Sequence, residues 1–289
     1  MRGVRGAVAR GGGFPYDSPR GAGGPRRFAG MKFGICTSVE NAAAVKSAGW
    51  AFVEENVQGL LQGQLADGEW KGMDRVRPSP LPVPAANCLV PGSLKVTGPD
   101  ASLDALRPYM TNVLRRAREV GMSILVFGSG AARNVPDGWD RAKARRQILD
   151  FLAMAAPIAA ENGVTLVAEH LNQGECNIIN SVAEAMTYVR EIDHPNFQCL
   201  VDSWHFWLEN EPLDTLRDAM PWIRHVHLAD TEDRVAPGES GKFDYRPFFG
   251  VLKRAGYDGM ISVEATGFND IQGVGPRVLS YVQSQWNEA

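Results

Sequence analysis

Four residues that can bind a metal ion or transfer a proton stand at the ends of four apolar segments in the second half of the chain. Each segment is short and rich in branched aliphatic side chains, which is typical of buried parallel strands. The residues that close these segments are Glu169, Asp202, His227 and Glu264. Three carboxylates and one imidazole supply hard oxygen ligands and one nitrogen ligand, a set that suits Mn²⁺, Mg²⁺ or Co²⁺. The pattern therefore predicts a site for one divalent metal ion, with Mn²⁺ favoured.

The segments that carry these residues must bring their ends to one place. From Met31 onward the chain alternates between strand-like and helix-like segments. The predicted strands cover residues 32–36, 51–55, 83–88, 123–127, 164–169, 197–202, 223–228 and 260–264. Eight strands alternating with helices over roughly 250 residues predict an α/β fold of the (β/α)8 type, the TIM barrel. The C-terminal ends of strands five to eight would line one half of the barrel mouth, so the four candidate ligands would converge there.

A doubly wound open sheet is the alternative arrangement of alternating strands and helices. That fold would carry a glycine-rich phosphate-binding turn after the first strand. The segment from Cys36 to Glu40 contains no glycine and offers no such turn. The barrel is therefore the favoured architecture.

Residues 1–30 differ in composition from the rest of the chain. They are rich in glycine, arginine and proline, and they contain one acid, Asp17, against six arginines. Because they have little apolar surface to bury, we predict a disordered tail, followed by a single barrel domain over residues 31–289. An initiation site at Met31 is the other explanation of this segment. The tail carries +5, which leaves −3 − 5 = −8 on the remainder and disfavours nucleic acid as a partner.

The spacing of the cysteines and the hydropathy of the chain indicate in which cellular compartment the protein is expected. The cysteines, at positions 36, 88, 176 and 199, show no CxxC spacing, which favours free thiols in a reducing cytoplasm. The chain has no run that approaches the roughly 20 apolar residues of a membrane span. We therefore expect a cytoplasmic protein with a small-molecule partner and no membrane partner. We also expect a homo-oligomer, either a dimer or a tetramer.

Four short motifs surround the candidate ligands. They are EHLNQGE over 169–175, DSWH over 202–205, HLAD over 227–230 and ISVE over 261–264. In this order and spacing they resemble the xylose-isomerase-like barrels of the sugar phosphate isomerase/epimerase superfamily. The resemblance covers Met31 to the C-terminus and is closest to the ketose 3-epimerases of the D-tagatose/D-psicose type. It implies the same barrel fold and the same four metal ligands.

The resemblance also implies roles for individual residues around a sugar. Glu169 and Glu264 would act as the acid/base pair in addition to binding the metal. The residues expected to contact the carbonyl end of the sugar are Glu175, His205 and Arg234. Glu54, which closes the second predicted strand, is a further candidate for substrate contact and is equally compatible with a structural role.

The positions of the two glutamates favour one type of reaction. Strands five and eight lie three steps apart around the barrel, so Glu169 and Glu264 would approach a central ligand from separated directions. Epimerising a carbon next to a ketone removes a proton from one face and returns a proton to the other, through an enediolate that a metal ion can stabilise. We therefore favour C3 epimerisation of a ketose. An aldose–ketose isomerase needs a proton shuttled on one face only, and the same residues permit it.

Other reactions and other classes of protein remain open at this point. Hydroxypyruvate-type isomerisation, inosose dehydration and C-glycoside cleavage are alternatives on the same barrel. An endonuclease-IV-like DNA repair enzyme would use a trinuclear zinc site, and the five histidines and the acidic body count against it. A non-catalytic sugar-binding module is also possible, although the complete ligand set disfavours it.

Overall fold

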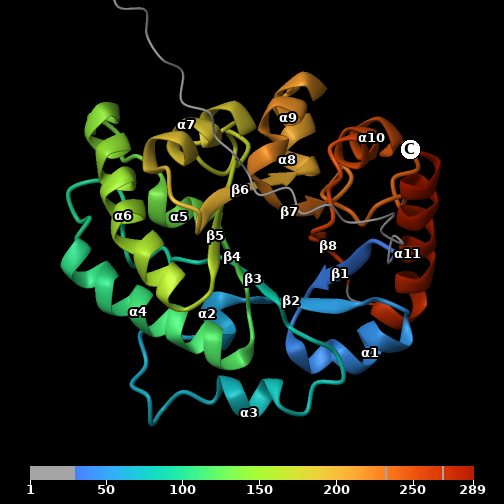
Figure 1. The fold of residues 1–289 in the computed structure, drawn as a ribbon, viewed down its shortest axis with the longest axis horizontal. Coiled ribbons are helices and arrows are strands. Elements are labelled where there is room, and N and C mark those ends of the chain that lie inside the picture. Colours follow the sequence, from blue (N-terminus) through green and yellow to red (C-terminus); the bar gives the residue numbers. More distant parts are fainter. Residues whose placement is uncertain (1–29, 232, 269) are drawn as a thin grey trace, which may run out of the picture. The chain divides into compact units, whose positions relative to one another are not determined.

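The computed structural model describes residues 30–231, 233–268 and 270–289. The segment predicted as a disordered tail, residues 1–30, lies outside the described residues except for Gly30. The described residues from Met31 onward contain eight parallel strands that close into a barrel, in the order β1 to β8 (Figure 1). This arrangement confirms the predicted TIM barrel. The strands are β1 (Lys32–Cys36), β2 (Phe52–Asn56), β3 (Ala85–Asn87), β4 (Ile124–Phe127), β5 (Thr165–Glu169), β6 (Phe197–Asp202), β7 (Ile223–Leu228) and β8 (Met260–Val263).

Helices alternate with the strands and surround them (Figure 1). Short 3₁₀ helices, η1 (Val39–Asn41) and η2 (Met220–Trp222), precede α1 and β7. The α-helices are α1 (Ala42–Ser47), α2 (Val57–Leu60), α3 (Gly72–Val76), α4 (Leu103–Val120), α5 (Gly130–Arg133), α6 (Arg141–Glu161), α7 (Val182–Ile192), α8 (Ser203–Leu208), α9 (Leu213–Ala219), α10 (Arg246–Arg254) and α11 (Ile271–Glu288).

The strands are buried on both faces, which explains why they read as continuous apolar runs in the sequence. Every residue of β4 and of β6 is buried. Side chains that point inward fill the barrel and form their own apolar cluster, consisting of Ala85, Ile124, Val126, Val167 and Leu200. Side chains that point outward pack against the helices. This part of the interior is therefore a packed apolar core.

Closure of the barrel depends on the pairing of the first and last strands. Phe33 of β1 lies opposite Ile261 of β8 in parallel register. In the neighbouring pair, His227 of β7 lies opposite Ser262 of β8. Because β1 and β8 are adjacent, residues from the two ends of the sequence share one wall of the barrel.

The third strand is shorter than predicted. It covers three residues rather than the predicted 83–88. Pro82 and Pro84 come shortly before its first residue, and a proline has no N–H to donate to a sheet. Their carbonyl groups still accept hydrogen bonds, from Val53 and from Ser123 respectively, so the barrel wall stays continuous.

The long connection between β2 and β3 is held by a buried arginine. The Arg116 side chain on α4 has no exposed surface and donates hydrogen bonds to the carbonyl oxygens of Leu61, Gln62 and Leu65. Its guanidinium also lies 5.1 Å from the centre of the Trp70 ring. These contacts fix the segment that begins with α2, and Gln58 of α2 lines the cavity described below.

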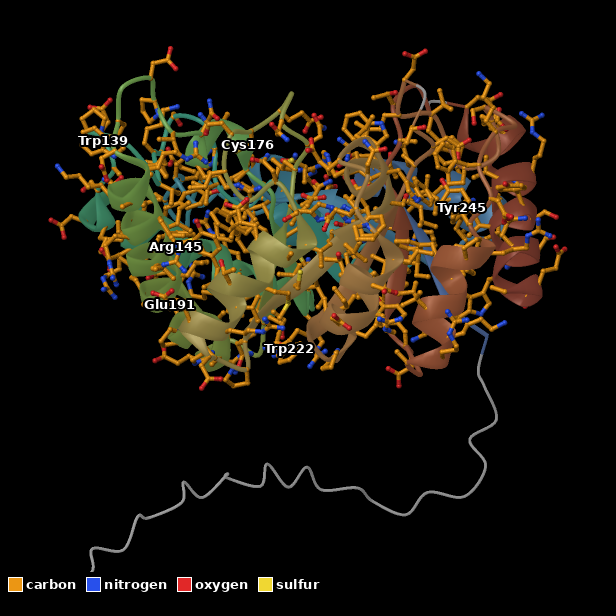
Figure 2. The ribbon with its side chains drawn as sticks, turned by 90° about the horizontal axis from the view of Figure 1, so that it is seen from above. Trp139, Arg145, Cys176, Glu191, Trp222 and Tyr245 are labelled. Atoms are coloured by element: carbon orange, nitrogen blue, oxygen red, sulfur yellow. The ribbon has the colours of Figure 1, made fainter. Side chains whose placement is uncertain are left out.

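Charged residues are found mainly on the outside of the helical layer. Arg145 on α6 and Glu191 on α7 lie beside each other there and form an ion pair of 2.5 Å (Figure 2). All four cysteines are free, as the sequence predicts. Among the described residues, no helix combines the length and the apolarity that crossing a membrane requires.

Candidate metal centre and active site

The four predicted metal ligands lie together at the C-terminal end of the barrel. Glu169 closes β5, Asp202 closes β6, His227 is the fifth residue of β7, and Glu264 directly follows β8. One ligand atom from each residue lies within 4.8 Å of the corresponding atoms of the other three. The parallel pairing explains this convergence, because Asp202 is opposite His227 in the register of neighbouring strands. The structure thus brings together all four residues that the sequence singles out.

His227 lies at the centre of this cluster. Its Nδ1 atom is 3.1 Å from Glu169 Oε1 and 3.0 Å from Glu264 Oε2. The side chain has no exposed surface. Burial acts to lower the pKa of His227, but the carboxylates of Glu54 and Glu264 outweigh it and raise the pKa well above the usual value. The imidazole therefore sits where positive charge is strongly favoured.

Two of the carboxylates are held by neighbouring hydrogen bonds. Asp202 Oδ1 accepts the backbone N–H of Trp204 and so caps α8, which leaves Oδ2 directed at the cluster. Glu264 Oε1 accepts a hydrogen bond of 2.6 Å from Asn87 Nδ2. Each carboxylate therefore keeps one oxygen for the centre of the cluster while its other oxygen is fixed from outside.

The glutamates that close β5 and follow β8 differ in their affinity for protons. Burial, assisted by the charge of Glu264, raises the pKa of Glu169 to about 7. Burial also acts to raise the pKa of Glu264, but His227 and Arg234 lower it to about 2. Two carboxyl groups whose environments separate their pKa values are suited to act as acid and base in one reaction.

Arg234 extends from the loop after β7 into the same cluster. Its Nη2 atom is 2.9 Å from Asp202 Oδ2 and 2.5 Å from Glu264 Oε2. The guanidinium carbon lies 4.5 Å from the centre of the Trp204 ring, so the group is stacked as well as paired. Its Nη1 atom is 3.6 Å from Glu175 Oε1. This arginine thus balances the negative charge of the carboxylates.

His205 is held as a neutral hydrogen-bond donor. The backbone N–H of Asn172 donates to His205 Nδ1 over 3.0 Å, so the ring proton must be on Nε2. Burial lowers the pKa of His205 to about 3, which keeps the ring uncharged. Among the residues that the structure describes, none forms a hydrogen bond with the Nε2 atom, and His205 lines the cavity described next. A neutral N–H in this position is suited to bind a carbonyl or hydroxyl oxygen of a ligand.

A cavity of about 290 Å³ lies over the cluster. Five of the predicted site residues line it, namely Glu169, Glu175, His205, Arg234 and Glu264. Gly128, which follows β4, forms part of the wall, and a Cβ atom there would lie only 2.1 Å from Glu169 Oε2. A glycine at this position therefore gives the Glu169 carboxylate the room that it occupies.

Several lining residues are not among those predicted from the sequence. They come from the first half of the barrel and include Gln58, Asn87, Cys88 and Ser129. Asn87 is a polar residue that closes a strand, the same signal that identified the four ligands. The predicted third strand ended one residue later, at Cys88, and that error concealed the signal.

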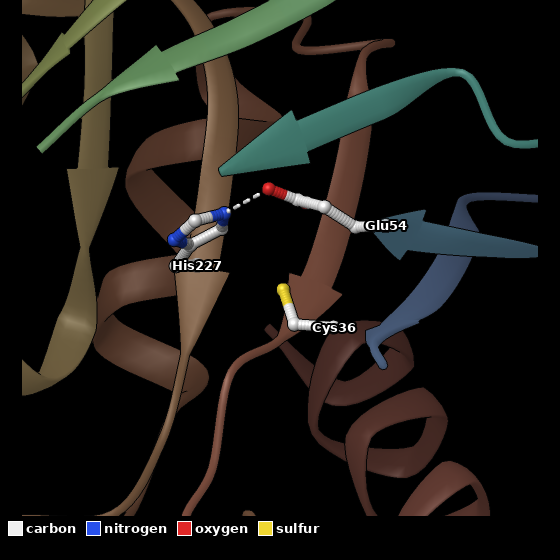
Figure 3. A group of neighbouring side chains, drawn as sticks. All are labelled: Cys36, Glu54 and His227. Carbon is white, nitrogen blue, oxygen red and sulfur yellow. Dashed lines mark hydrogen bonds and ion pairs between the residues drawn. The ribbon is translucent and has the colours of Figure 1, made fainter. Parts of the chain in front are cut away.

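Glu54, a candidate for substrate contact, has other neighbours. Its side chain is fully buried and does not line the cavity. It extends from β2 across the barrel interior to His227, with Cys36 close to both (Figure 3). Burial acts to raise the pKa of Glu54, but His227 and His225 lower it well below the usual value. The structure therefore places this carboxylate beneath the cluster, in contact with one of the four ligands.

Comparison with known proteins places the chain among barrels of one kind. A protein family described as "Xylose isomerase-like TIM barrel" matches residues 42–283. A putative hydroxypyruvate isomerase of Mus musculus is 27% identical over 165 residues, which are 54% of this chain and 58% of that protein. A ketose 3-epimerase of Arthrobacter globiformis is 27% identical over 129 residues, or 44% of each chain. The chain thus spans about half the length of these curated relatives.

A solved structure extends the similarity of fold over most of the chain. The crystal structure of 3-keto-D-glucoside 4-epimerase from Escherichia coli superposes with a TM-score of 0.74 at 21% identity. The match covers 88% of this chain and 100% of that one. At this level of identity the similarity establishes the fold alone.

Proposed function

The chain belongs to the xylose isomerase-like TIM barrel family, and we propose that it is a divalent-metal-dependent enzyme that epimerises or isomerises a sugar. The observation that carries this proposal is the cluster of three carboxylates and one imidazole on the floor of the cavity, with ligand atoms within 4.8 Å of one another. The relatives with a ketose 3-epimerase name and an isomerase name support the same class of reaction.

The donor set fits a divalent cation. Glu169, Asp202, His227 and Glu264 would hold the ion, and oxygen donors with a single nitrogen favour Mn²⁺ over Zn²⁺, which more often recruits additional histidine or cysteine. When bound, such an ion polarises a substrate carbonyl and stabilises the negative charge that develops after proton removal. Mn²⁺ is our proposal for the resident metal.

The two glutamates supply the proton chemistry. Glu169 and Glu264 approach His227 Nδ1 from different strands, at 3.1 and 3.0 Å. One carboxylate takes the proton from the carbon next to the carbonyl, and the C–H electrons pass into the enediolate. The other carboxyl group gives a proton to the opposite face, which inverts that carbon. We therefore favour C3 epimerisation of a ketose, in which one C–H bond breaks and one forms.

The carbonyl end of the sugar would be held by polar groups at the cavity wall. His205 offers its Nε2–H, and Arg234 and Glu175 line the same wall. A neutral donor and a guanidinium suit the oxygen atoms of a carbonyl and of its neighbouring hydroxyl. We propose that these three residues orient the substrate so that one carbon faces both glutamates.

Isomerisation of a hydroxycarbonyl compound is the second candidate reaction. The mouse relative with a hydroxypyruvate isomerase name supports it. It would require the same enediolate and a proton carried on one face only, by either glutamate. The homo-oligomeric state and the cytoplasmic location stay predictions.

Turnover in D₂O by Mn²⁺-loaded protein tests the proposal. Candidate substrates are D-fructose, D-tagatose, D-psicose, L-ribulose and hydroxypyruvate, followed by NMR. Epimerisation should yield the C3 epimer with deuterium at the inverted carbon, whereas isomerisation would yield an aldose–ketose exchange. The same protein treated with a chelator serves as the control and should be inactive. Equal turnover with and without the chelator would contradict a metal-dependent reaction.

A further inference from the structure

Beneath the four-residue cluster, a buried carboxylate contacts the ligand histidine from the side opposite the cavity. Glu54 Oε1 is 2.9 Å from His227 Nε2, and the side chains involved have no exposed surface. Glu54 comes from β2, whereas His227 comes from β7, so the contact crosses the barrel interior (Figure 3). Glu54 is therefore placed to act on the metal site through His227, without touching a substrate.

Both oxygens of the Glu54 carboxylate are used. Oε1 faces His227, while Oε2 is 2.6 Å from His225 Nε2 and 2.5 Å from Ser262 Oγ. An ionised carboxylate can only accept hydrogen bonds, so all three partners donate to it. Three donors from two neighbouring strands fix the carboxylate in place, and they satisfy a charge that would otherwise be costly to bury.

This arrangement determines which nitrogen of the His227 ring faces Glu54 and which faces the cluster. Because Nε2 donates to Glu54, the ring carries a proton on that nitrogen. The Nδ1 atom then faces the other side of the ring, where Glu169 Oε1 and Glu264 Oε2 lie, so it is the nitrogen that a metal ion can bind when it gives up its proton. The hydrogen bond thus specifies both the orientation of the imidazole and which nitrogen can bind a metal ion.

We propose that Glu54 is a positioning residue for the metal site, which holds His227 with its Nε2 proton toward β2 and its Nδ1 toward the carboxylates. This inference rests on the proposed metal-dependent function. Metal-binding histidines generally donate their other N–H to a carboxylate or carbonyl, and loss of that partner weakens metal binding by about 10–100-fold. The Glu54 carboxylate supplies this partner, and Ser262 and His225 in turn fix the carboxylate.

Cys36 lies close enough to complete a different arrangement. Its Sγ atom, a Glu54 oxygen and a His227 nitrogen also lie within 4.8 Å of one another. A second metal ion there would have to displace the proton on His227 Nε2 and the hydrogen bonds that hold Glu54. The hydrogen-bonded arrangement accounts for these contacts without a second ion, so we infer one ion per chain.

The next residue in β2 provides a matched control. Glu55 is also buried, at 3% exposure, but it faces away from the histidines. Its carboxylate accepts the backbone N–H of Val39 over 2.6 Å and lies 3.7 Å from Arg75. Replacing either glutamate with glutamine removes a buried negative charge from the same strand. Only Glu54→Gln leaves a single acceptor oxygen for the three donors His225, His227 and Ser262.

Isothermal titration of Mn²⁺ into chelator-treated and dialysed protein tests the inference. The unmodified protein should bind one ion, Glu54→Gln should bind it about 10–100-fold more weakly, and Glu55→Gln should bind it within about threefold of the unmodified protein. An unchanged affinity in Glu54→Gln would overturn the positioning role while leaving the proposed function intact. Two ions in the unmodified protein, with one lost in Glu54→Gln, would overturn it in favour of a second metal site. No binding by the unmodified protein would overturn both proposals.

A measurement on the unmodified protein keeps the inference testable if the Glu54 variant does not fold. Nitrogen-15 NMR of the histidine side chains, with the diamagnetic ion Zn²⁺ bound, reports which ring nitrogen carries the proton. The five histidines keep this spectrum simple. His227 should appear with its proton on Nε2. A proton on Nδ1, or none on either nitrogen, would overturn the inference.

Discussion

The two halves of the barrel contribute different things to the same site. Strands β5–β8, here called the ligand half, supply all four candidate metal ligands. Strands β1–β4, the supporting half, supply the groups that hold those ligands: Glu54 contacts His227, Asn87 donates to Glu264, and Gly128 leaves room for Glu169. The residues proposed to carry the chemistry therefore come from one half, while their positions depend on contacts from the other.

The largest effect should follow from removing a proton-transferring group in the ligand half. Glu169→Gln and Glu264→Gln keep an oxygen that can still bind a metal ion but remove the base, so turnover should fall by at least about 10²–10⁴-fold. Steady-state rates with the best ketose, measured together with bound metal, check this. The control is Glu55→Gln, which should keep most of the activity. Full turnover by both variants would contradict the assignment of the acid/base pair.

A smaller effect should come from crowding in the supporting half. In Gly128→Ala, the new Cβ would lie 2.1 Å from Glu169 Oε2 and would force that carboxylate to move. Misplacing a reacting group by about 1 Å can cost on the order of 10²-fold in rate, so we expect a loss of about 10–100-fold in kcat with little change in melting temperature. Gly59→Ala is the control, because its Cβ would meet its neighbours at 3.8 Å. Equal rates for the two variants would show that the supporting half does not set the position of Glu169.

A still smaller effect is expected from the hydrogen bond that holds Glu264. Asn87→Ala removes the donor that lies 2.6 Å from Glu264 Oε1. A hydrogen bond to a charged group contributes about 1.5 kcal/mol, which corresponds to roughly a tenfold loss in kcat/KM. Asn112→Ala serves as the control, since Asn112 donates to the Gly63 carbonyl in another part of the molecule. If both variants retain full activity, Asn87 has no part in positioning the base.

The smallest effect concerns the stability of the fold rather than the rate, and it comes from His170, which directly follows β5. His170 is fully buried, and burial lowers its pKa to about 3. The unfolded chain therefore binds a proton at this residue below about pH 6.5, whereas the folded chain does not, so stability falls as the pH decreases from there toward 3. His170→Gln should reduce this loss by at most about 1.4 kcal/mol per pH unit.

Denaturant unfolding of chelator-treated protein at pH 7.5 and pH 5 measures this difference. The control is His194→Gln, whose ring lies half-buried in the turn before β6. It should follow the unmodified protein at both pH values. An unchanged pH dependence in His170→Gln would mean that this ring becomes protonated in the folded state.

The sequence predicted the ligand half more completely than the supporting half. A carboxylate or histidine that closes an apolar run is visible in one dimension, and four such residues in successive strands identify the cluster. Gly128 carries no comparable signal, because its importance depends on an atom about 40 residues away in the chain. The signal at Asn87 was concealed by the misplaced end of the third strand, and its partner Glu264 lies nearly 180 residues away. Glu54 was recognised as a candidate, but only the fold shows that its carboxylate faces His227 instead of the cavity.

The number and order of the strands were predicted correctly, whereas the ends of some strands were not. Alternation of apolar runs with helical segments was sufficient to identify the barrel. The limits of β3 were predicted less well, since three short side chains preceded by prolines have little hydrophobic pattern. This short strand is also where the sequence failed to identify Asn87 as part of the site.

The most direct test of the proposed metal centre is anomalous diffraction from a crystal of the Mn²⁺-loaded protein. We predict one strong peak, at about 2.0–2.4 Å from one oxygen of Glu169, Asp202 and Glu264 and from Nδ1 of His227. The Glu54 carboxylate should remain hydrogen-bonded to Nε2 on the far side of the ring. A peak bound instead by Cys36, Glu54 and Nε2 of His227, or no peak at either position, would contradict the assignment of the metal centre.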